Sequence, residues 1–375
     1  MKKQCGVVLE NMYVDGALAP NRPCFTLSPN TQTRRLGIVC VLLDGVRRGK
    51  RLRATAESWL QDLSDTIGMN LERSPIRSGN VSMARSSSGH YFALCKQLNL
   101  VIERGSVLTP TRAGKRLLSH YWSGSQPYPL RAETATALLY ALLCNDFFGL
   151  KTIIRALRRG RDTVDAIRAH FQSELIDVLA EGRCTKVPAY RRAVEDRRKV
   201  VSNWKKPEKY AEHGVTARLN WLADVGLVRC DLEAVPRTYR ICPLRTDVAS
   251  LVDAVKYPTR RAILDQLCTF RFTLKDPQAD LTSKDVDELL RDCLEARAFE
   301  TDRPHKIRKK VLTEDLILEV LIGYPHLLRK LAASNVRLVD RLNGFCTHHW
   351  RYDVVVASRS SQCYVLRTEA HGKGA

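Results

Sequence analysis

Basic side chains crowd one short stretch of the sequence, residues 205–218. The stretch holds, on one predicted helix, Lys205, Lys206, Lys209, Tyr210 and Arg218. Lysine ammonium groups neutralise phosphates, and an arginine that makes two hydrogen bonds to a guanine edge contributes about 1–3 kcal/mol of base discrimination. The set therefore predicts contact with nucleic acid. For Arg218 taken singly, a salt-bridged surface arginine is the alternative.

Two further sets of polar and basic residues occupy comparable positions along the chain. The first surrounds a predicted hairpin and comprises Arg77, Arg85, Ser87, His90, Arg104, Arg112 and Arg116. The second comprises Lys284, Arg303, Lys306, Arg308 and Lys309. Arg112 and Arg116 are four residues apart and share a helix face, which is either a phosphate-binding stripe or a solvated surface. The hairpin position of the second set favours backbone contact over base reading.

The elements that position these side chains follow one order. In residues 90–121 a helical pattern is followed by a strand-like run at 100–103 and a turn at Arg104 and Gly105. The chain then returns as a second strand, and Thr109 before a proline predicts the start of another helix. Helix, two-stranded wing and helix in this order are typical of a winged helix.

The same order recurs twice. In residues 202–244 an apolar helix ends at Gly226 and is followed by two strand-like runs. A fainter third pass covers 257–312, where helices precede a basic turn and strand. We interpret this as repetition of a structural module and not of a sequence. Two strand-like runs, at 351–357 and 362–367, follow near the end of the chain.

These patterns predict a mainly α fold with small β wings (α+β), built from tandem winged-helix domains and a C-terminal helix and β-hairpin segment. The expected divisions are an N-terminal arm at 1–36, winged-helix domain 1 at 37–130, a helical segment with winged-helix domain 2 at 131–247, winged-helix domain 3 at 248–312 and a C-terminal segment at 313–375.

Composition limits the class of protein. The 375 residues include 61 Lys+Arg against 40 Asp+Glu, so the formal net charge is +21. A hydrophobic content of 44% is ordinary for a folded chain, and no run approaches the roughly 18–20 apolar residues of a membrane span. Such an excess of charge favours a polyanionic partner, with nucleic acid first and an anionic membrane surface second. A solvated basic face is the plain alternative.

The sequence holds no strong catalytic or metal-binding motif. Its 12 cysteines include no CxxC pair, which disfavours a zinc ribbon, and several lie in apolar periodic stretches that predict buried, reduced thiols. Phosphate-binding loops, dinucleotide fingerprints, GxSxG and HExxH are absent from the sequence. We therefore expect no cofactor and no resident metal.

The chain resembles the DNA-recognition region of FokI-type type IIS restriction endonucleases, which consists of three consecutive winged-helix subdomains. The resemblance covers roughly residues 75–312 and lies mostly in the order of elements. The residues that carry it are Asn203, Trp204, Lys209, Tyr210, Ala211, Trp221, Leu222, Gly226, Leu227, Val228 and, at the third set of helices, residues 259–262.

The resemblance also implies a nuclease core after the recognition region, in which two carboxylates and a lysine bind Mg²⁺ and activate water. Asp353 and Glu369 have a spacing that suits the two acids, but Ala370 and His371 stand where the motif would continue to its lysine. A nuclease remnant and a structural hairpin are the alternatives to an active site here. Mg²⁺ is expected only if the nuclease interpretation holds.

We therefore expect a sequence-specific double-stranded DNA-binding protein, the recognition component of a restriction or defence-like system. Its expected partners are double-stranded DNA and a separate nuclease or other protein subunit, with no membrane. It is expected in the cytoplasm, associated with the nucleoid if bacterial. The alternatives are a divergent Mg²⁺-dependent endonuclease using Asp353 and Glu369, and a winged-helix scaffold for protein interaction or RNA binding.

Overall fold

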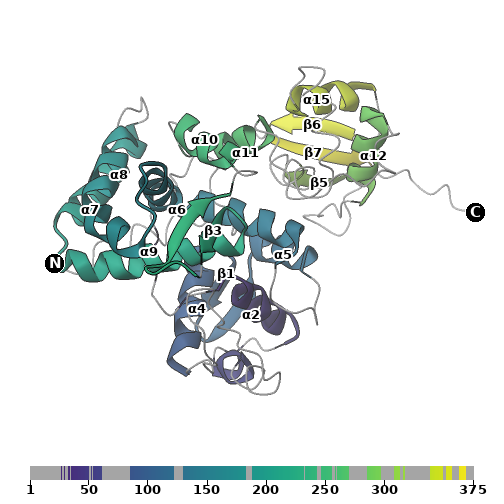
Figure 1. The fold of residues 1–375 in the computed structure, drawn as a ribbon. Helices are drawn as coiled ribbons and strands as arrows, with labels where there is room; N and C mark the ends of the chain where they lie inside the picture. The colour runs from purple at the N-terminus through teal and green to yellow at the C-terminus, as the bar shows by residue number, and fades with distance from the viewer. Residues whose placement is uncertain are drawn as a thin grey trace, which may run out of the picture. The chain divides into compact units, whose positions relative to one another are not determined.

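The computed structural model places two compact units, Met1–Ile263 and Leu264–Ala375, each of which is described by itself (Figure 1). The described elements are mostly helices with small antiparallel strand sets, which confirms the mainly α fold with small β elements. The structure describes residues 27, 29, 33, 35–49, 52, 54–60, 85–121, 130–182, 188–231, 233–242, 246–255, 258, 260–269, 285–296, 308–312, 316, 338–348, 352–356 and 363–368.

Helix α2 (Gly37–Arg47), the first described helix of the first unit, is buried at nearly all of its residues. The first described elements of this unit are α2, a helix at 54–60, α4 (Arg85–Gln97), β1 (Val101–Arg104), β2 (Val107–Pro110) and α5 (Arg112–Ser119). Asn99 adopts φ 56° after α4, and Gly105 adopts φ 61° in the β1–β2 turn, a conformation that glycine tolerates without strain. The predicted cap at Thr109 is wrong: β2 continues through this residue, and Thr111 caps α5 by accepting a hydrogen bond from the backbone N–H of Gly114 at 3.1 Å.

A longer set of helices follows in the same unit. These are α6 (Ala132–Arg158), α7 (Val164–Gly182), α8 (Pro188–Ser202) and α9 (Pro207–Asp224), then β3 (Val228–Asp231), β4 (Thr238–Ile241), α10 (Thr246–Ala254) and α11 (Arg260–Thr269), which spans the division between the units. Gly226 adopts φ 71° between α9 and β3, as its position after the predicted helix suggests. The predicted order of a helix followed by two strands is confirmed both for α4, β1 and β2 and for α9, β3 and β4.

Helix α6 is the central helix of this unit. By length and composition alone it is apolar enough to cross a membrane, but 83% of its most apolar stretch is buried inside the protein, as in a core helix. Its backbone departs from helical geometry at Asp146 (φ −136°, ψ 27°), a residue with no exposed surface. A buried carboxylate at a break in the central helix requires a partner.

Arg218 of α9 supplies that partner. Its Nε and Nη2 donate to the two carboxylate oxygens of Asp146, both at 2.7 Å. Nη1 donates to the carbonyl oxygen of Gly214 at 2.9 Å, and Nη2 also reaches the carbonyl oxygen of Leu27 at 3.0 Å. Burial raises the pKa of Asp146, and Arg218 opposes this effect. The bidentate pair therefore fixes α9 against α6 in a site that water does not reach.

The segment at 27–36 lies across the same region. The backbone N–H of Leu27 donates to Asp146 at 2.8 Å, and the indole N–H of Trp221 donates to the carbonyl oxygen of Thr33 at 2.8 Å. Arg35 pairs with Asp224 at 2.8 Å. Within the expected N-terminal arm at 1–36, the described residues Leu27, Thr33, Arg35 and Leu36 thus contact α6 or α9. Residues 1–26 lie outside the described part of the chain.

The second unit contains one three-stranded antiparallel sheet among its described residues. Its elements are α12 (Val286–Ala296), β5 (Arg308–Leu312), α15 (Leu338–His348), β6 (Tyr352–Val356) and β7 (Cys363–Thr368). The strand order is β5-β7-β6, with Val311 opposite Val365 and Val354 also opposite Val365. β5, which falls within the expected winged-helix domain 3 at 248–312, thus pairs with the last strand of the expected C-terminal segment at 313–375.

Three segments of the chain share one topology, and we call them the first, second and third modules (37–110, 132–241 and 286–368). In each module the last strand is paired on both sides. One neighbour is an earlier strand or a single bridge residue, and the other is the strand that follows the last helix of the module. Leu52 bridges to Val107 of β2, and Thr163 bridges to Thr238 of β4. In the third module β7 lies between β5 and β6. The passes expected at 90–121 and 202–244 fall within or overlap the first and second modules, whereas the third pass was expected at 257–312 and the third module runs from α12 to β7.

Removing the Asp146 carboxylate is expected to destabilise the first unit. Asp146→Ala leaves the Arg218 charge buried without its partner, so the free energy of unfolding should fall by about 3–5 kcal/mol. Urea unfolding followed by tryptophan fluorescence measures this, because Trp221 is buried in the same unit. Asp165→Ala, at a side chain that is 89% exposed, is the control and should change it by less than about 0.5 kcal/mol. Equal effects of the two substitutions would contradict the role of the pair.

Asp224 predicts a pH dependence of stability. Burial raises the pKa of Asp224 to about 6, with Arg35 opposing this effect. Because the folded pKa lies above the unfolded value, the folded state binds the proton more tightly, and its stability falls as pH rises from about 4 to 6. Between pH 7 and pH 4, the free energy of unfolding of the wild-type protein should rise by up to about 3 kcal/mol relative to that of Asp224→Asn. Urea unfolding at several pH values tests this, and a pH-independent difference would contradict it.

Candidate nucleic-acid interface

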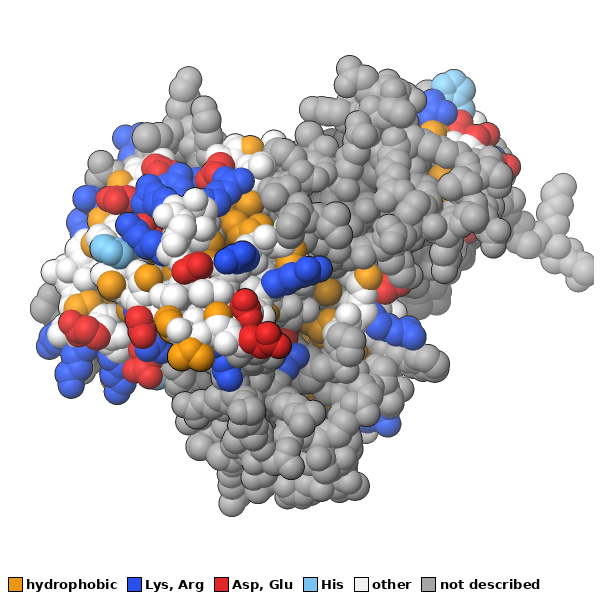
Figure 2. Space-filling model, viewed as in Figure 1, with side chains coloured by type: hydrophobic (Ala, Val, Ile, Leu, Met, Phe, Trp, Pro, Cys, Tyr) orange, Lys and Arg blue, Asp and Glu red, His pale blue; other side chains and the backbone are white. Residues whose placement is uncertain are grey.

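Three exposed lysines surround the start of α9. Lys205, Lys206 and Lys209 are all exposed, and Lys206 is the N-cap residue of the helix. Within the described part of the chain, no carboxylate forms an ion pair with any of them. Along the left edge of the face in Figure 2, Lys and Arg side chains alternate with acidic ones, so the positive charge is not a continuous field. The three ammonium groups are therefore exposed and are not neutralised by a described carboxylate.

An aromatic column adjoins these lysines. The ring of Tyr210 stacks on Trp204 with centroids 4.8 Å apart and planes at 20°. Trp204 stacks in turn on Phe171 at 6.4 Å and 21°. Phe171 is buried, whereas Tyr210 remains 50% exposed. The sequence placed Tyr210 at the edge of the apolar face, but Phe171 and Trp204 are 33 positions apart, and no sequence pattern signalled their contact.

Arg218 does not belong to this interface. The side chain is 2% exposed, and its guanidinium is occupied by Asp146, Gly214 and Leu27. It cannot form the guanine contact expected from its position on α9. The salt-bridged alternative is the correct one, although the pair is buried and not on the surface. Helical spacing could have indicated the burial of Arg218, though not its partner, because the residues three and four positions away on α9 include the apolar Val215, Trp221 and Leu222.

In the first module the predicted residues divide into exposed and inward-facing ones. Arg104 is exposed at the β1–β2 turn, and His90 of α4 is half-buried. Arg116 is only 8% exposed and Arg112 is half-buried, so the two side chains do not form an exposed face, either for phosphate or for solvent. On the short helix α5, Arg116 is buried together with Leu117 and Leu118. Arg85 and Ser87 lie at the start of α4, and Arg77 lies outside the described residues.

In the second unit the structure revises the predicted basic set at 284–309. Arg308 and Lys309 lie on β5, opposite Thr368 and Arg367 of β7, so they belong to a sheet strand and not to a wing tip. Lys284, Arg303 and Lys306 lie outside the described residues. The predicted acid Asp353 lies on β6, an edge strand, opposite Leu366. Its expected partner Glu369 lies outside the described residues.

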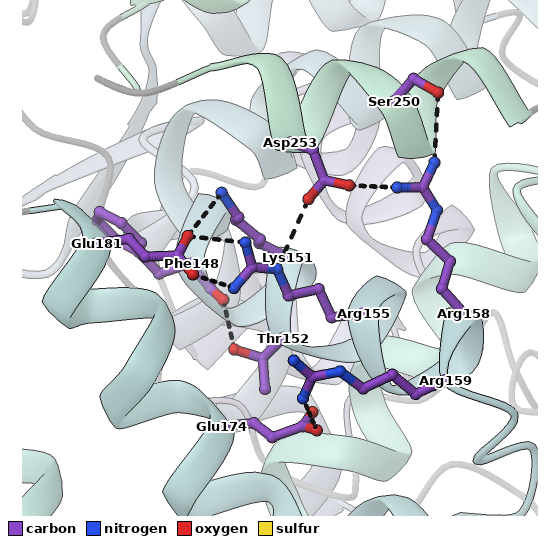
Figure 3. A network of polar contacts seen from close by, with 10 residues as sticks. All are labelled: Phe148, Lys151, Thr152, Arg155, Arg158, Arg159, Glu174, Glu181, Ser250 and Asp253. Atoms are coloured by element: carbon purple, nitrogen blue, oxygen red, sulfur yellow. Dashed lines mark hydrogen bonds and ion pairs between the residues drawn. The ribbon is translucent and has the colours of Figure 1, made fainter.

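The arginines of the basic stretch at 155–161 form ion pairs with acids of the same chain (Figure 3). Glu181 pairs with both Lys151 and Arg155, and Asp253 of α10 accepts from Arg158. Burial, followed by the neighbouring Arg155, lowers the pKa of Lys151. These side chains join α6, α7 and α10. No sequence pattern indicated this network, because the acids lie far along the chain.

Glu174 plays the same role for the end of the stretch. It accepts hydrogen bonds from both Arg159 and Arg161 and is itself buried. Most of the cations at 155–161 are therefore used within the fold. The exposed lysines at the start of α9 differ from them in having no such acid within the described residues.

The described residues contain no group of three or more histidine, cysteine, aspartate or glutamate side chains placed to hold a metal ion. An open pocket between α7 and α8 is lined by side chains of both signs, namely Arg191, Arg192 and Lys199 with Glu195 and Asp196. Seven cysteines are seen as free thiols, and six of these seven are buried. Comparison of the chain with models of protein families, with curated proteins and with solved structures finds no match.

The structural role of Glu174 is open to a direct test. Glu174→Gln weakens the charge-assisted hydrogen bonds from Arg159 and Arg161, so the free energy of unfolding should fall by about 1–3 kcal/mol. Asp177→Asn, at an exposed acid on the same helix α7, is the control and should have little effect. Chemical unfolding of both variants provides the measurement. No loss of stability in Glu174→Gln would contradict the view that this basic stretch is internal.

Proposed function

We propose that this protein binds double-stranded DNA through three winged-helix modules. The observation that carries the proposal is the shared connectivity of the modules, in which the last strand lies between the first and the second. In a winged helix, the helix before the hairpin enters the major groove, and the hairpin contacts the backbone. The net charge of +21 supports a polyanionic partner.

Each module then has one candidate recognition helix. They are α4 in the first, α9 in the second and α15 in the third. In the second module the lysines at the start of α9 would bind phosphates, together with the exposed Arg229 and Arg240 on the β3–β4 hairpin. In the first module the exposed Arg104 at the β1–β2 turn would do the same.

We further propose that the protein is the recognition component of a restriction or defence-like system, with the nuclease supplied by another subunit. The resemblance of residues 75–312 to the recognition region of FokI-type endonucleases supports this. The position of Asp353 on a small antiparallel edge strand gives no support to a nuclease within the chain.

The salt dependence of DNA binding tests the role of the α9 lysines. Fluorescence anisotropy with a labelled duplex should show binding at low salt that weakens as salt rises. Replacing Lys205, Lys206 and Lys209 by alanine should flatten the slope of log K against log salt by up to about 2.7, because each phosphate that a lysine neutralises contributes about 0.9 to that slope.

A charge-matched variant serves as the control. Replacing Arg191, Arg192 and Lys199 on α8 removes the same net charge from a surface that mixes both signs, so its slope should change less. Equal slopes in the two variants would show that net charge alone acts. Absence of wild-type binding to any duplex at low salt would refute the proposed function.

A further inference from the structure

We infer that the exposed ring of Tyr210 is a stacking platform for an unpaired nucleobase. The inference rests on the proposed DNA-binding function and names the part of the nucleic acid that the start of α9 would take. It concerns a base that has left the duplex stack, either extrahelical or in a single-stranded segment.

The platform is the outer end of a column that begins in the core. Arg218 lies over the face of Phe171, with its Cζ 5.6 Å from the ring centroid. Phe171 stacks on Trp204, and Trp204 on Tyr210. Each ring holds the next in a near-parallel orientation. The column thus extends from a fully buried ion pair to a ring that is 50% exposed.

The origin of the column makes the outer ring rigid. Arg218 is fixed by two hydrogen bonds to Asp146, so the first member of the column cannot reorient. A ring whose orientation is set in advance loses little conformational freedom when a ligand stacks on it, which favours binding. A tyrosine that only shielded Trp204 from solvent would not require Trp204 to be stacked on Phe171 and Arg218.

The lysines around Tyr210 favour a ligand that carries phosphate beside its ring, such as a nucleotide, over an uncharged aromatic ligand. Lys206, Lys209 and Tyr210 fall on one side of α9 by helical spacing, with Lys205 just before it. Glu208 and Glu212, also exposed, fall on the other flank. Ammonium groups beside a ring can bind the phosphates that flank a base stacked on it, as in proteins that bind single strands.

Stacking requires an unpaired base because a paired base already has neighbours on both faces. In a duplex the bases present only their edges to the grooves, and a flat ring face reads edges poorly. A base outside the stack exposes its π-face, and stacking on an aromatic side chain contributes about 1–3 kcal/mol per base. The geometry of Tyr210 therefore matches an unpaired base better than a paired one.

Two duplexes that differ by one extrahelical thymine provide the test, with affinities measured by anisotropy. Tyr210→Ala should weaken binding to the bulged duplex by about 5- to 150-fold and leave binding to the fully paired duplex nearly unchanged. Tyr210→Phe keeps the ring and should bind both duplexes as the wild-type protein does. Val200→Ala, at an exposed apolar side chain on α8, is the matched control and should change neither affinity.

The outcomes separate this inference from the proposed function. Equally weakened binding to both duplexes in Tyr210→Ala, or unchanged binding to both while the triple lysine variant binds weakly, would overturn the stacking role and leave DNA binding intact. If Tyr210→Ala unfolds, as circular dichroism would show, wild-type preference for the bulged duplex decides: equal affinities overturn the inference. Failure of the wild-type protein to bind either duplex would overturn the proposed function as well.

Discussion

The buried ion pair between Asp146 and Arg218 is the interaction on which the arrangement of the first unit depends. It joins the central helix α6 to α9, and both partners also bind the backbone of Leu27. A buried charge without its partner is strongly unfavourable, so the pair admits few alternative packings of these elements. Phe171 lies against Arg218, and Trp204 and Tyr210 follow it to the surface. A core electrostatic constraint thereby orients a surface ring.

Two groups of basic side chains in the first unit differ in whether they are paired with acids. Cations at the end of α6 are neutralised by Glu174, Glu181 and Asp253 and tie neighbouring helices together. Lysines at the start of α9 have no such acids among the described residues. Because the cations of the first group are already paired, the formal excess of +21 overstates the unpaired positive charge that is left for a polyanion. Local pairing, more than net charge, distinguishes an interface from an internal network.

Periodicity and turn residues predicted the local elements well and the long-range contacts poorly. The helix and hairpin orders around Gly105 and Gly226 are present, because positive φ at glycine is a local property. The role of Arg218 was not predictable, since its partner lies 72 residues away. The β5 strand was recognised, but its pairing with β7 was not, because register depends on residues more than 50 positions apart. Burial of Arg116 on a short helix was missed for a similar reason, as its surroundings come from other elements.

Amide hydrogen exchange, with and without duplex DNA, tests the central claim most directly, because it reports each element of the proposed interface separately. On DNA binding we expect slower exchange at the start of α9, in the β1–β2 and β3–β4 hairpins and in α15. The amides at the end of α6, where the cations are already paired, should be unaffected. Protection confined to α6 and α7, or no protection by DNA at any of these elements, would contradict the claim.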